Sequence, residues 1–412
     1  MSGNTQAEIC ERLYKKTPSF SPDIEKGLDT LAEVLITKSI VIEDADRLLL
    51  WFDEPAKPLI KRIYELVVER WVEVSFFERD LGVDAQLIPG MSEVQIFEYF
   101  EEQRKLVQAA SKMLIVRGSK NPEVIAQLPE DEAQIYNVAY DWVHREAVNT
   151  FKGRTLMYWP TEYEAEKQQI SQEDYLRLVL KASNQPWDEI SLAQAKLVTM
   201  LNHGEKLRFV ANENQHDSEK KTEVSMSIKG MSFCNSTIHR NFPGSEVFSA
   251  PVLDSVEGNV FAEGKYLYQG FLMEDIHLKI KHGKIIEAVA EKGERGLQRI
   301  LASGEGARYF GEVALGTNPG LAKRLFNPLL NEKVGGSFHL AIGHCYELEN
   351  YNGEQVRVNN GNTSEKTPIH WDLTVLMHEN VGGGRVELDG KVIQENGVFV
   401  DQDLARLNPV FK

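Results

Sequence analysis

Cysteine is scarce in this sequence: only Cys10, Cys234 and Cys345 occur among its 412 residues. An odd and sparse count excludes a disulfide framework of the kind that stabilises small secreted domains. The spacing of the three residues also matches neither a zinc ribbon nor a redox-active pair. The sequence is therefore typical of a protein from a reducing compartment.

Long apolar segments are also missing. No run of about 18 apolar residues occurs, so we expect no membrane-spanning helix and no membrane partner. The first residues, MSGNTQAEICERLYKK, contain no apolar stretch of signal-peptide length. Together with the few cysteines, these absences predict a cytoplasmic protein.

Positive charge is in short supply as well. Lys and Arg number 46 against 62 Asp and Glu, which leaves a formal net charge of −16. Nucleic acids are bound through clustered positive charge, so no nucleic-acid partner is expected. The acidic excess is first of all typical of a soluble surface, and a sharper interpretation is that part of it binds cations.

The first half of the chain contains alternating strand and helix patterns. Short apolar runs predict strands at 47–52, 72–77, 113–116 and 156–159. Helical apolar spacing predicts helices at 28–40, 60–71 and 130–148. Such alternation is typical of βαβ units around a mainly parallel sheet. No GxGxxG or Walker loop occurs in this half, so a nucleotide is not the expected ligand.

The pattern changes near residue 200. A helical stretch at 171–201 gives way to short strands separated by glycine turns, with one helix at 294–301. We therefore predict an α/β protein with two domains: an N-terminal α/β domain at 1–200 and a strand-rich α+β domain at 201–412.

Imidazole and carboxylate groups in the second half are candidates for metal binding. If 369–372 (IHWD) forms a strand, His370 and Asp372 point to one face and present nitrogen and oxygen side by side. A lone His-x-Asp is common by chance, and such a histidine is more often structural or solvated. His339 lies in the apolar run SFHLAIG, where a buried imidazole needs either a hydrogen-bond partner or a metal ion.

Two glutamates are flanked by apolar residues, Glu312 in YFGEVAL and Glu246 in PGSEVFSAP. Burying an ionised carboxylate costs several kcal/mol unless it is paired or coordinated, although each residue taken singly is more often at a half-exposed edge. His344 and Cys345 lie close to the His339 run and are expected to be neighbours of a site rather than ligands. The separations along the chain are too long for spacing alone to assemble these groups.

Four sequence blocks resemble the aminopeptidase T family of metallopeptidases, which includes aminopeptidase S and PepS. In order, the blocks are NFPGSEVFSAP, EGARYFGEVAL, SFHLAIGHCY and IHWD. Weaker similarity covers SKNPEVIA, WPTEYEAEKQ and TEVSMSI. The GHCYELE turn and the glycine-rich VGGGRVELDG near the end differ from the common members of the family.

This resemblance implies a pair of divalent ions (Zn, Co or Mn) held in the 201–412 domain. Carried over residue by residue, it implies metal ligands at five positions: Glu246, Glu312, His339, His370 and Asp372. It places the family's tyrosine at Tyr346. It also implies a homodimer that admits short peptides.

The expected function is therefore that of a metalloaminopeptidase, which releases N-terminal residues from short peptides. Two neighbouring ions lower the pKa of a shared water, and the resulting hydroxide attacks the first peptide bond. Asp372 fits a bridging ligand, Glu312 or Glu246 fits the general base, and Tyr346 fits a hydrogen-bond donor to the oxyanion. Two alternatives remain open: another di-metal amide hydrolase, such as an amidase or deacetylase, or a non-catalytic, metal-free binding protein.

Overall fold

The computed structural model describes residues 6–15, 18–150 and 153–411. Contacts within the chain divide it into two compact units. Unit 1 comprises Met1–Asn184 and Ile238–Pro243, and unit 2 comprises Gln185–Thr237 and Gly244–Lys412. The domains predicted from the sequence, 1–200 and 201–412, stay a prediction.

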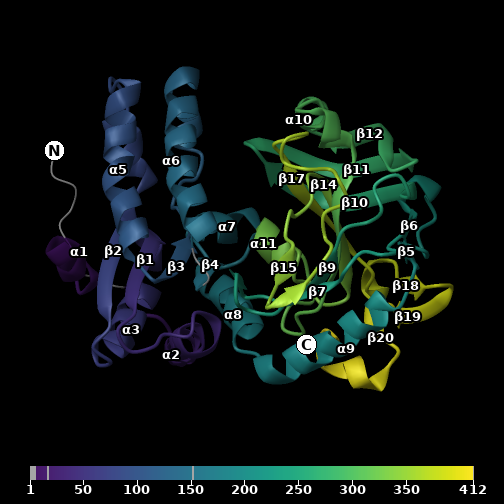
Figure 1. Cartoon of the computed structure of the whole chain (residues 1–412), viewed down its shortest axis with the longest axis horizontal. Coiled ribbons are helices and arrows are strands. Elements are labelled where there is room, and N and C mark those ends of the chain that lie inside the picture. Colours follow the sequence, from purple (N-terminus) through teal and green to yellow (C-terminus); the bar gives the residue numbers. More distant parts are fainter. Residues whose placement is uncertain (1–5, 16–17, 151–152, 412) are drawn as a thin grey trace. The chain divides into compact units, whose positions relative to one another are not determined.

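A parallel sheet forms the centre of unit 1 (Figure 1), with the strand order β2-β1-β3-β4-β8. Its strands are β1 (Arg47–Asp53), β2 (Glu73–Arg79), β3 (Lys112–Arg117), β4 (Arg154–Tyr158) and β8 (Asn241–Phe242). The four strands predicted in the first half are confirmed as β1 to β4. In β1 every residue after Arg47 is buried, as expected for a central strand that is covered on both faces.

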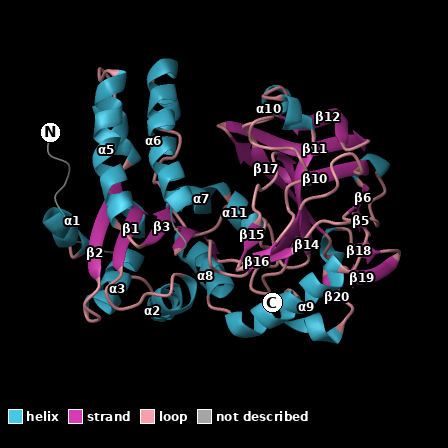
Figure 2. Cartoon of the chain, viewed as in Figure 1, coloured by secondary structure: helices cyan, strands magenta, loops and turns pink. Residues whose placement is uncertain are grey.

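Helices surround this sheet in the sequence order that the βαβ pattern predicts (Figure 2). The α-helices of unit 1 are α1 (Gln6–Leu13), α2 (Pro22–Val34), α3 (Lys57–Val68), α4 (Leu81–Leu87), α5 (Glu93–Ala109), α6 (Glu130–Thr150), α7 (Glu162–Lys167) and α8 (Gln172–Ser183). Short helical segments follow three other elements: η1 (Leu35–Ser39), η2 (Glu54–Ala56) and η3 (Ile125–Gln127).

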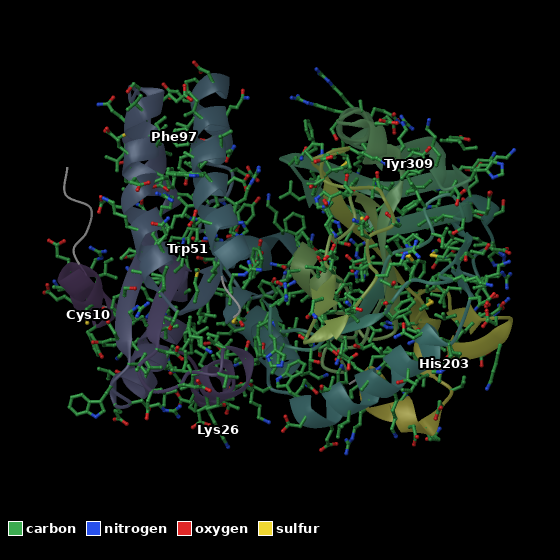
Figure 3. All side chains as sticks on the ribbon, viewed as in Figure 1. Cys10, Lys26, Trp51, Phe97, His203 and Tyr309 are labelled. Carbon is green, nitrogen blue, oxygen red and sulfur yellow. The ribbon has the colours of Figure 1, made fainter. Side chains whose placement is uncertain are left out.

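One apolar cluster joins the sheet to α5 and α6. Trp51 of β1 stacks on Phe77 of β2 with ring centroids 4.6 Å apart, and Phe100 of α5 meets Tyr136 of α6 edge to face. Figure 3 marks Trp51 near the sheet and Phe97 farther along the two long helices. The burial of these large aromatic rings stabilises this part of unit 1.

Two helical predictions need correction. The segment at 171–201 is not one helix, because α8 ends at Ser183 and α9 (Trp187–Asn202) begins after Pro186, which has no N–H to continue the hydrogen-bond ladder. The helix predicted at 28–40 begins earlier, at Pro22, since proline is favourable in the first turn of a helix. The sequence pattern also does not predict α4 and α5.

The stability of unit 1 should depend on pH through His144 of α6. Its ring lies edge-on to Trp51, and burial, helped by the charges of Arg117 and Arg154, lowers the pKa of His144 to about 4. The unfolded chain takes up this proton near pH 6.5, so the free energy of unfolding should fall between pH 6.5 and 4, by up to about 3 kcal/mol. Urea unfolding at pH 7 and at pH 4.5 measures this change, and the drop should be smaller in His144→Gln. An equal drop in the variant would rule out this contribution.

Unit 2 is rich in antiparallel strands, which fill most of it in Figure 2. Its larger sheet has eight strands, in the spatial order β12 (Lys284–Lys292), β11 (Phe271–Lys281), β10 (Glu257–Tyr268), β6 (Thr222–Ser227), β5 (Lys206–Ala211), β18 (Gly384–Leu388), β19 (Lys391–Glu395) and β20 (Val398–Phe399). A second sheet has the order β17 (His370–Leu376), β14 (Ser337–Gly343), β13 (Phe310–Gly316), β9 (Glu246–Ser249) and β7 (Cys234–Ser236). A small hairpin joins β15 (Asn350–Tyr351) and β16 (Glu354–Gln355).

The helices of unit 2 are few and mostly short. They are α9, α10 (Glu294–Leu301), α11 (Pro328–Asn331), η4 (Ser218–Lys220), η5 (Glu305–Arg308), η6 (Glu379–Val381) and η7 (Gln402–Leu407). The helix predicted at 294–301 is confirmed as α10. The predicted class, an α/β protein with a mainly parallel N-terminal sheet and a strand-rich second part, is also confirmed. Within the described residues, no helix combines the length and apolar character needed to cross a membrane.

Candidate metal centre

The five predicted ligands all lie on one face of the five-stranded sheet in unit 2. In the register of β17, β14 and β13, Asp372 pairs with Ala341, which pairs with Glu312. His370 precedes Asp372 by two residues on β17 and therefore points to the same face. The structure thus confirms the strand and the shared face that the sequence predicts for these two residues.

The other two predicted ligands, His339 and Glu246, lie on the same face of the sheet. His339 pairs with Ala314, two residues beyond Glu312 on β13, and Glu246 of β9 pairs with Gly316. Residues two apart on a strand point the same way, so both side chains face the same region as Glu312. Residues far apart in the sequence are brought together by strand pairing alone.

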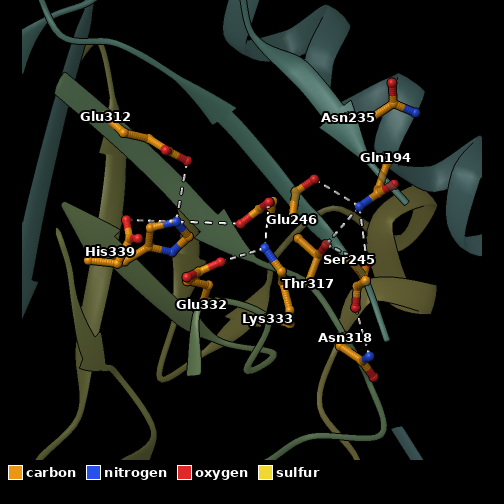
Figure 4. A network of polar contacts seen from close by, with 12 residues as sticks. Gln194, Asn235, Ser245, Glu246, Glu312, Thr317, Asn318, Glu332, Lys333 and His339 are labelled. Atoms are coloured by element: carbon orange, nitrogen blue, oxygen red, sulfur yellow. Dashed lines mark hydrogen bonds and ion pairs between the residues drawn. The ribbon is translucent and has the colours of Figure 1, made fainter. Parts of the chain in front are cut away.

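Three of these side chains form a first group, Glu246, Glu312 and His339, with one potential ligand atom from each lying within 4.8 Å of the others. His339 Nε2 lies 3.5 Å from Glu246 Oε2 and 3.4 Å from Glu312 Oε1. Figure 4 shows the His339 ring between the two carboxylates. All three residues are buried, with 6% of Glu246, 2% of Glu312 and 1% of His339 exposed.

A second group shares Glu312 with the first and adds His370 and Asp372, again within 4.8 Å. His370 Nε2 lies 3.1 Å from Glu312 Oε2 and 3.9 Å from Asp372 Oδ1. Glu312 therefore directs one oxygen toward each histidine. Glu312 is thus the residue common to both groups.

The orientation of His370 is set by the main chain. Its Nδ1 lies 2.6 Å from the carbonyl oxygen of His344, which can only accept, so Nδ1 carries the proton and Nε2 faces the carboxylates. Metal-binding histidines commonly make such a second hydrogen bond. As expected, His344 is a neighbour of the cluster, and Cys345 points its Sγ toward Asn359 instead.

Several buried polar atoms at this face lack a hydrogen bond within the described part of the chain: Glu246 Oε2, His339 Nδ1, His339 Nε2 and Asp372 Oδ1. Apart from His339 Nδ1, these atoms have only the longer ion-pair contacts of 3.4 to 3.9 Å. Buried polar atoms are normally satisfied, and leaving them without a partner is costly. Carboxylate oxygen and imidazole nitrogen are the donors that Zn²⁺ and similar divalent ions take. The residues therefore fit a divalent metal centre.

The electrostatics of the cluster favour a cation. Burial alone would lower the pKa of His339, but its contact with Glu312 and the charges of Asp372 and Glu246 raise it to about 9. Burial would also lower the pKa of His370, but the charge of Asp372 and the contact with Glu312 outweigh burial and raise this pKa to about 10. Burial would raise the pKa of Glu312, yet the two histidines lower it to about 2. The carboxylates thus hold protons on the imidazoles, and metal ions would bind by displacing these protons.

Tyr346 lies beside this cluster. Its ring centroid is 5.2 Å from that of His370 and 5.4 Å from that of Phe248, and 39% of the residue is exposed. Partial desolvation and the nearby carboxylates raise the pKa of its hydroxyl, so Tyr346 keeps its proton at neutral pH. The protonated phenol of Tyr346, which is partly exposed beside the cluster, can donate a hydrogen bond to a ligand.

The sequence gives no sign of Lys333, which is fully buried behind Glu246. Its Nζ lies 2.6 Å from Glu246 Oε1 and 2.8 Å from Glu332 Oε2, as Figure 4 shows. In the sequence Asn331-Glu332-Lys333 these residues resemble an ordinary charged surface turn. Lys333 thus occupies one oxygen of Glu246 and leaves Oε2 directed toward His339.

Comparison with known proteins connects this geometry to a family. A family model described as thermophilic metalloprotease (M29) matches residues 24–399. Aminopeptidase T from Thermus thermophilus is 36% identical over 179 residues, which cover 42% of this chain and 40% of that protein. Aminopeptidase AmpS from Bacillus subtilis is 35% identical over 120 residues, 28% of this chain and 29% of that protein. These alignments span less than half the length of either relative.

A solved structure shows the same fold. It is that of wild-type AmpT from Thermus thermophilus, which superimposes with a TM-score of 0.72 at 21% identity. The match covers 92% of this chain and all of that chain. The family match extends over nearly the whole sequence and includes every strand of the candidate metal centre. This chain therefore belongs to the thermophilic metalloprotease (M29) family.

Proposed function

We propose that this chain is a metal-dependent aminopeptidase that removes N-terminal residues from short peptides with the help of two divalent ions. The observation that carries the proposal is the convergence of Glu246, Glu312, His339, His370 and Asp372 on one sheet face. Family membership implies a divalent metal. Two relatives bear the name aminopeptidase, which supports an N-terminal cleavage specificity.

We assign one ion to each of the two groups that share Glu312. Glu246, Glu312 and His339 would hold one ion, and Glu312, His370 and Asp372 would hold the other, with Zn, Co and Mn as the candidate metals. Bound ions of this kind lower the pKa of a water molecule and polarise a peptide carbonyl. The ligand set has three carboxylates, enough to balance most of the charge of two divalent ions.

The protein's own groups supply the remaining chemistry. Glu312 or Glu246 would take the proton from the attacking water, since each has a carboxylate oxygen at the cluster, and would return it to the amine that leaves when the C–N bond breaks. The Tyr346 hydroxyl donates a hydrogen bond to the oxygen of the attacked carbonyl as negative charge develops there. Asp372, which the sequence suggests as a bridge, belongs to the second group only, so it would be a ligand of the second ion, while Glu312 is the carboxylate common to both groups. We also infer a cytoplasmic homodimer as the working form.

A chelation experiment tests this function. The purified protein is incubated with EDTA and dialysed, and release of the first amino acid from a tripeptide with a free amino group is measured. Activity should be lost and should return with Zn²⁺, Co²⁺ or Mn²⁺, because each supplies the Lewis acid that protein groups alone do not provide. Elemental analysis should find about two equivalents of metal per chain.

The N-acetylated form of the same tripeptide is the control. An aminopeptidase needs the free amine, so the acetylated peptide should be inert. Equal cleavage of both peptides would point to a general amide hydrolase instead. Full activity after removal of all metal would contradict the proposal as a whole.

A further inference from the structure

The side chain of a buried glutamine, Gln194, forms a hydrogen bond with the main chain of Glu246. Gln194, on α9, is fully buried, and its Nε2 lies 3.1 Å from the carbonyl oxygen of Glu246. The same nitrogen lies 3.0 Å from Ser245 Oγ and 3.0 Å from Thr317 Oγ1. The Thr237 hydroxyl donates to Gln194 Oε1 at 2.7 Å. Figure 4 shows Gln194 with Glu246, Ser245 and Thr317.

The orientation of this amide follows from its partners. The carbonyl of Glu246 can only accept a hydrogen bond, so the nitrogen of Gln194 must face it. An amide nitrogen has two hydrogens; one goes to this carbonyl and the other to the hydroxyl pair of Ser245 and Thr317, which are 2.7 Å apart. Every polar atom of the Gln194 side chain is therefore used.

The backbone that Gln194 holds is strained. Ser245, the residue just before Glu246, has φ = +107°, a region that is unfavourable for a residue other than glycine. Two further bonds flank it: Thr317 N–H donates to the Ser245 carbonyl at 3.0 Å, and Asn318 Nδ2 donates to the Gly244 carbonyl at 2.8 Å. Such a conformation persists only where its surroundings enforce it.

The position of Gln194 on its helix makes these bonds informative. The buried face of α9 includes Ile190, Gln194, Leu197 and Leu201, at the spacing of an apolar helical stripe. A leucine at 194 would suit that stripe by pattern, yet the chain has an amide whose hydrogen bonds all converge on the segment before the proposed ligand. Helix packing alone does not explain a glutamine at this place.

From these contacts we propose that Gln194 is a positioning residue, which sets the direction of Glu246 and so the metal affinity of the group formed by Glu246, Glu312 and His339. The inference rests on the proposed function, since it assumes that Glu246 is a metal ligand. Gln194 fixes the main chain of Glu246, and Lys333 fixes one end of its carboxylate. Glu246 Oε2 is thereby aimed at the cluster before any ion arrives.

Metal titration of the apoprotein tests this role without any substrate. Binding of Zn²⁺ to wild type and to Gln194→Leu is followed by competition with a chromophoric chelator and analysed as two sites. In Gln194→Leu one site should weaken tenfold or more, as removal of a supporting hydrogen bond does in other metal centres, while the other site changes less than about threefold. Adding Ser245→Gly should restore part of the affinity, because glycine adopts φ = +107° without strain.

Gln394 offers a matched control in the same unit. It lies on β19, is fully buried, and its amide has no hydrogen-bond partner among the described residues. Gln394→Leu removes an equally buried amide and should leave both metal affinities unchanged. A comparable loss in Gln394→Leu, or wild-type affinity at both sites in Gln194→Leu, would overturn the proposal.

A second variant covers the case in which Gln194→Leu does not fold. Thr317→Val removes one acceptor of the Gln194 amide with little change in shape, and should weaken the same site about three- to tenfold. Unchanged affinity in this folded variant would also count against the role of the network. If wild type itself binds no metal, the proposed function fails first, so the two failures are distinguishable.

Discussion

Replacing Glu312 by glutamine should reduce peptide hydrolysis by roughly a thousandfold or more, because outer partners of a metal centre already contribute 10- to 100-fold and a direct ligand contributes more. Glu312 is the carboxylate common to both groups, with Oε1 3.4 Å from His339 Nε2 and Oε2 3.1 Å from His370 Nε2. Glutamine keeps the size but loses the charge, and its NH₂ cannot donate a lone pair to an ion. The measurements are kcat/KM on a free-amine tripeptide and metal content by elemental analysis.

Glu395→Gln is the control for this substitution. Glu395 is an exposed glutamate at the end of β19, so its loss of charge should change neither metal content nor rate. Circular dichroism of the Glu312→Gln variant should retain the wild-type spectrum in the absence of metal. A Glu312→Gln protein that keeps two equivalents of metal and normal turnover would refute the assignment of the centre.

Replacing Lys333 by methionine should lower the free energy of unfolding of the metal-free protein by about 3–5 kcal/mol. Lys333 is fully buried between the carboxylates of Glu246 and Glu332, at 2.6 and 2.8 Å. Burial raises the pKa of both acids, and the Lys333 charge opposes that rise. Methionine removes the cation closest to both acids and leaves His339, 3.5 Å from Glu246 Oε2, as the remaining cationic neighbour of Glu246, which costs far more than losing a pair on the surface.

Urea unfolding with a chelator present measures this effect. Lys196→Met is the matched control, because Lys196 forms an exposed pair with Asp403 and its loss should change stability by less than about 1 kcal/mol. Adding Glu332→Gln to Lys333→Met should recover part of the loss, since one of the two stranded charges is removed. An unchanged urea midpoint in Lys333→Met would show that the buried pair contributes nothing.

Local pattern was enough to predict much of the fold. Strands β1, β3 and β4 are short apolar runs and α10 has a clear helical repeat, so each is visible in the sequence. Helix α5 is not visible in this way, because only Ile96, Phe100 and Val107 of its 17 residues are buried and the rest of the helix is mostly polar. The capping pair of Ser92 and Gln95 is the local signal that marks its start.

The candidate centre was predictable in a different sense. The residue types and the His-x-Asp spacing indicate candidate metal ligands, and the resemblance to a family implies all five ligand positions. Their meeting depends on strand register: Glu246 reaches the others only because β9 pairs with β13, which no periodicity within either segment reveals. Lys333 and Gln194 cannot be predicted from the sequence for a related reason, because the residue that both contact, Glu246, lies far away along the chain. A polar residue on the apolar stripe of α9 was the one available hint for Gln194.

Ala341 sits in the row between Asp372 and Glu312, contributing a single methyl group where its neighbours contribute carboxylates. Side chains directly opposite on paired strands are about 5 Å apart, so this methyl sets how much room lies between the two acids. A valine or leucine at position 341 would leave all five proposed ligands unchanged in the sequence, but its larger side chain would fill the space between them. Intact ligands are therefore not enough to preserve this centre: an alanine with no chemistry of its own is as much a part of it as the acids on either side.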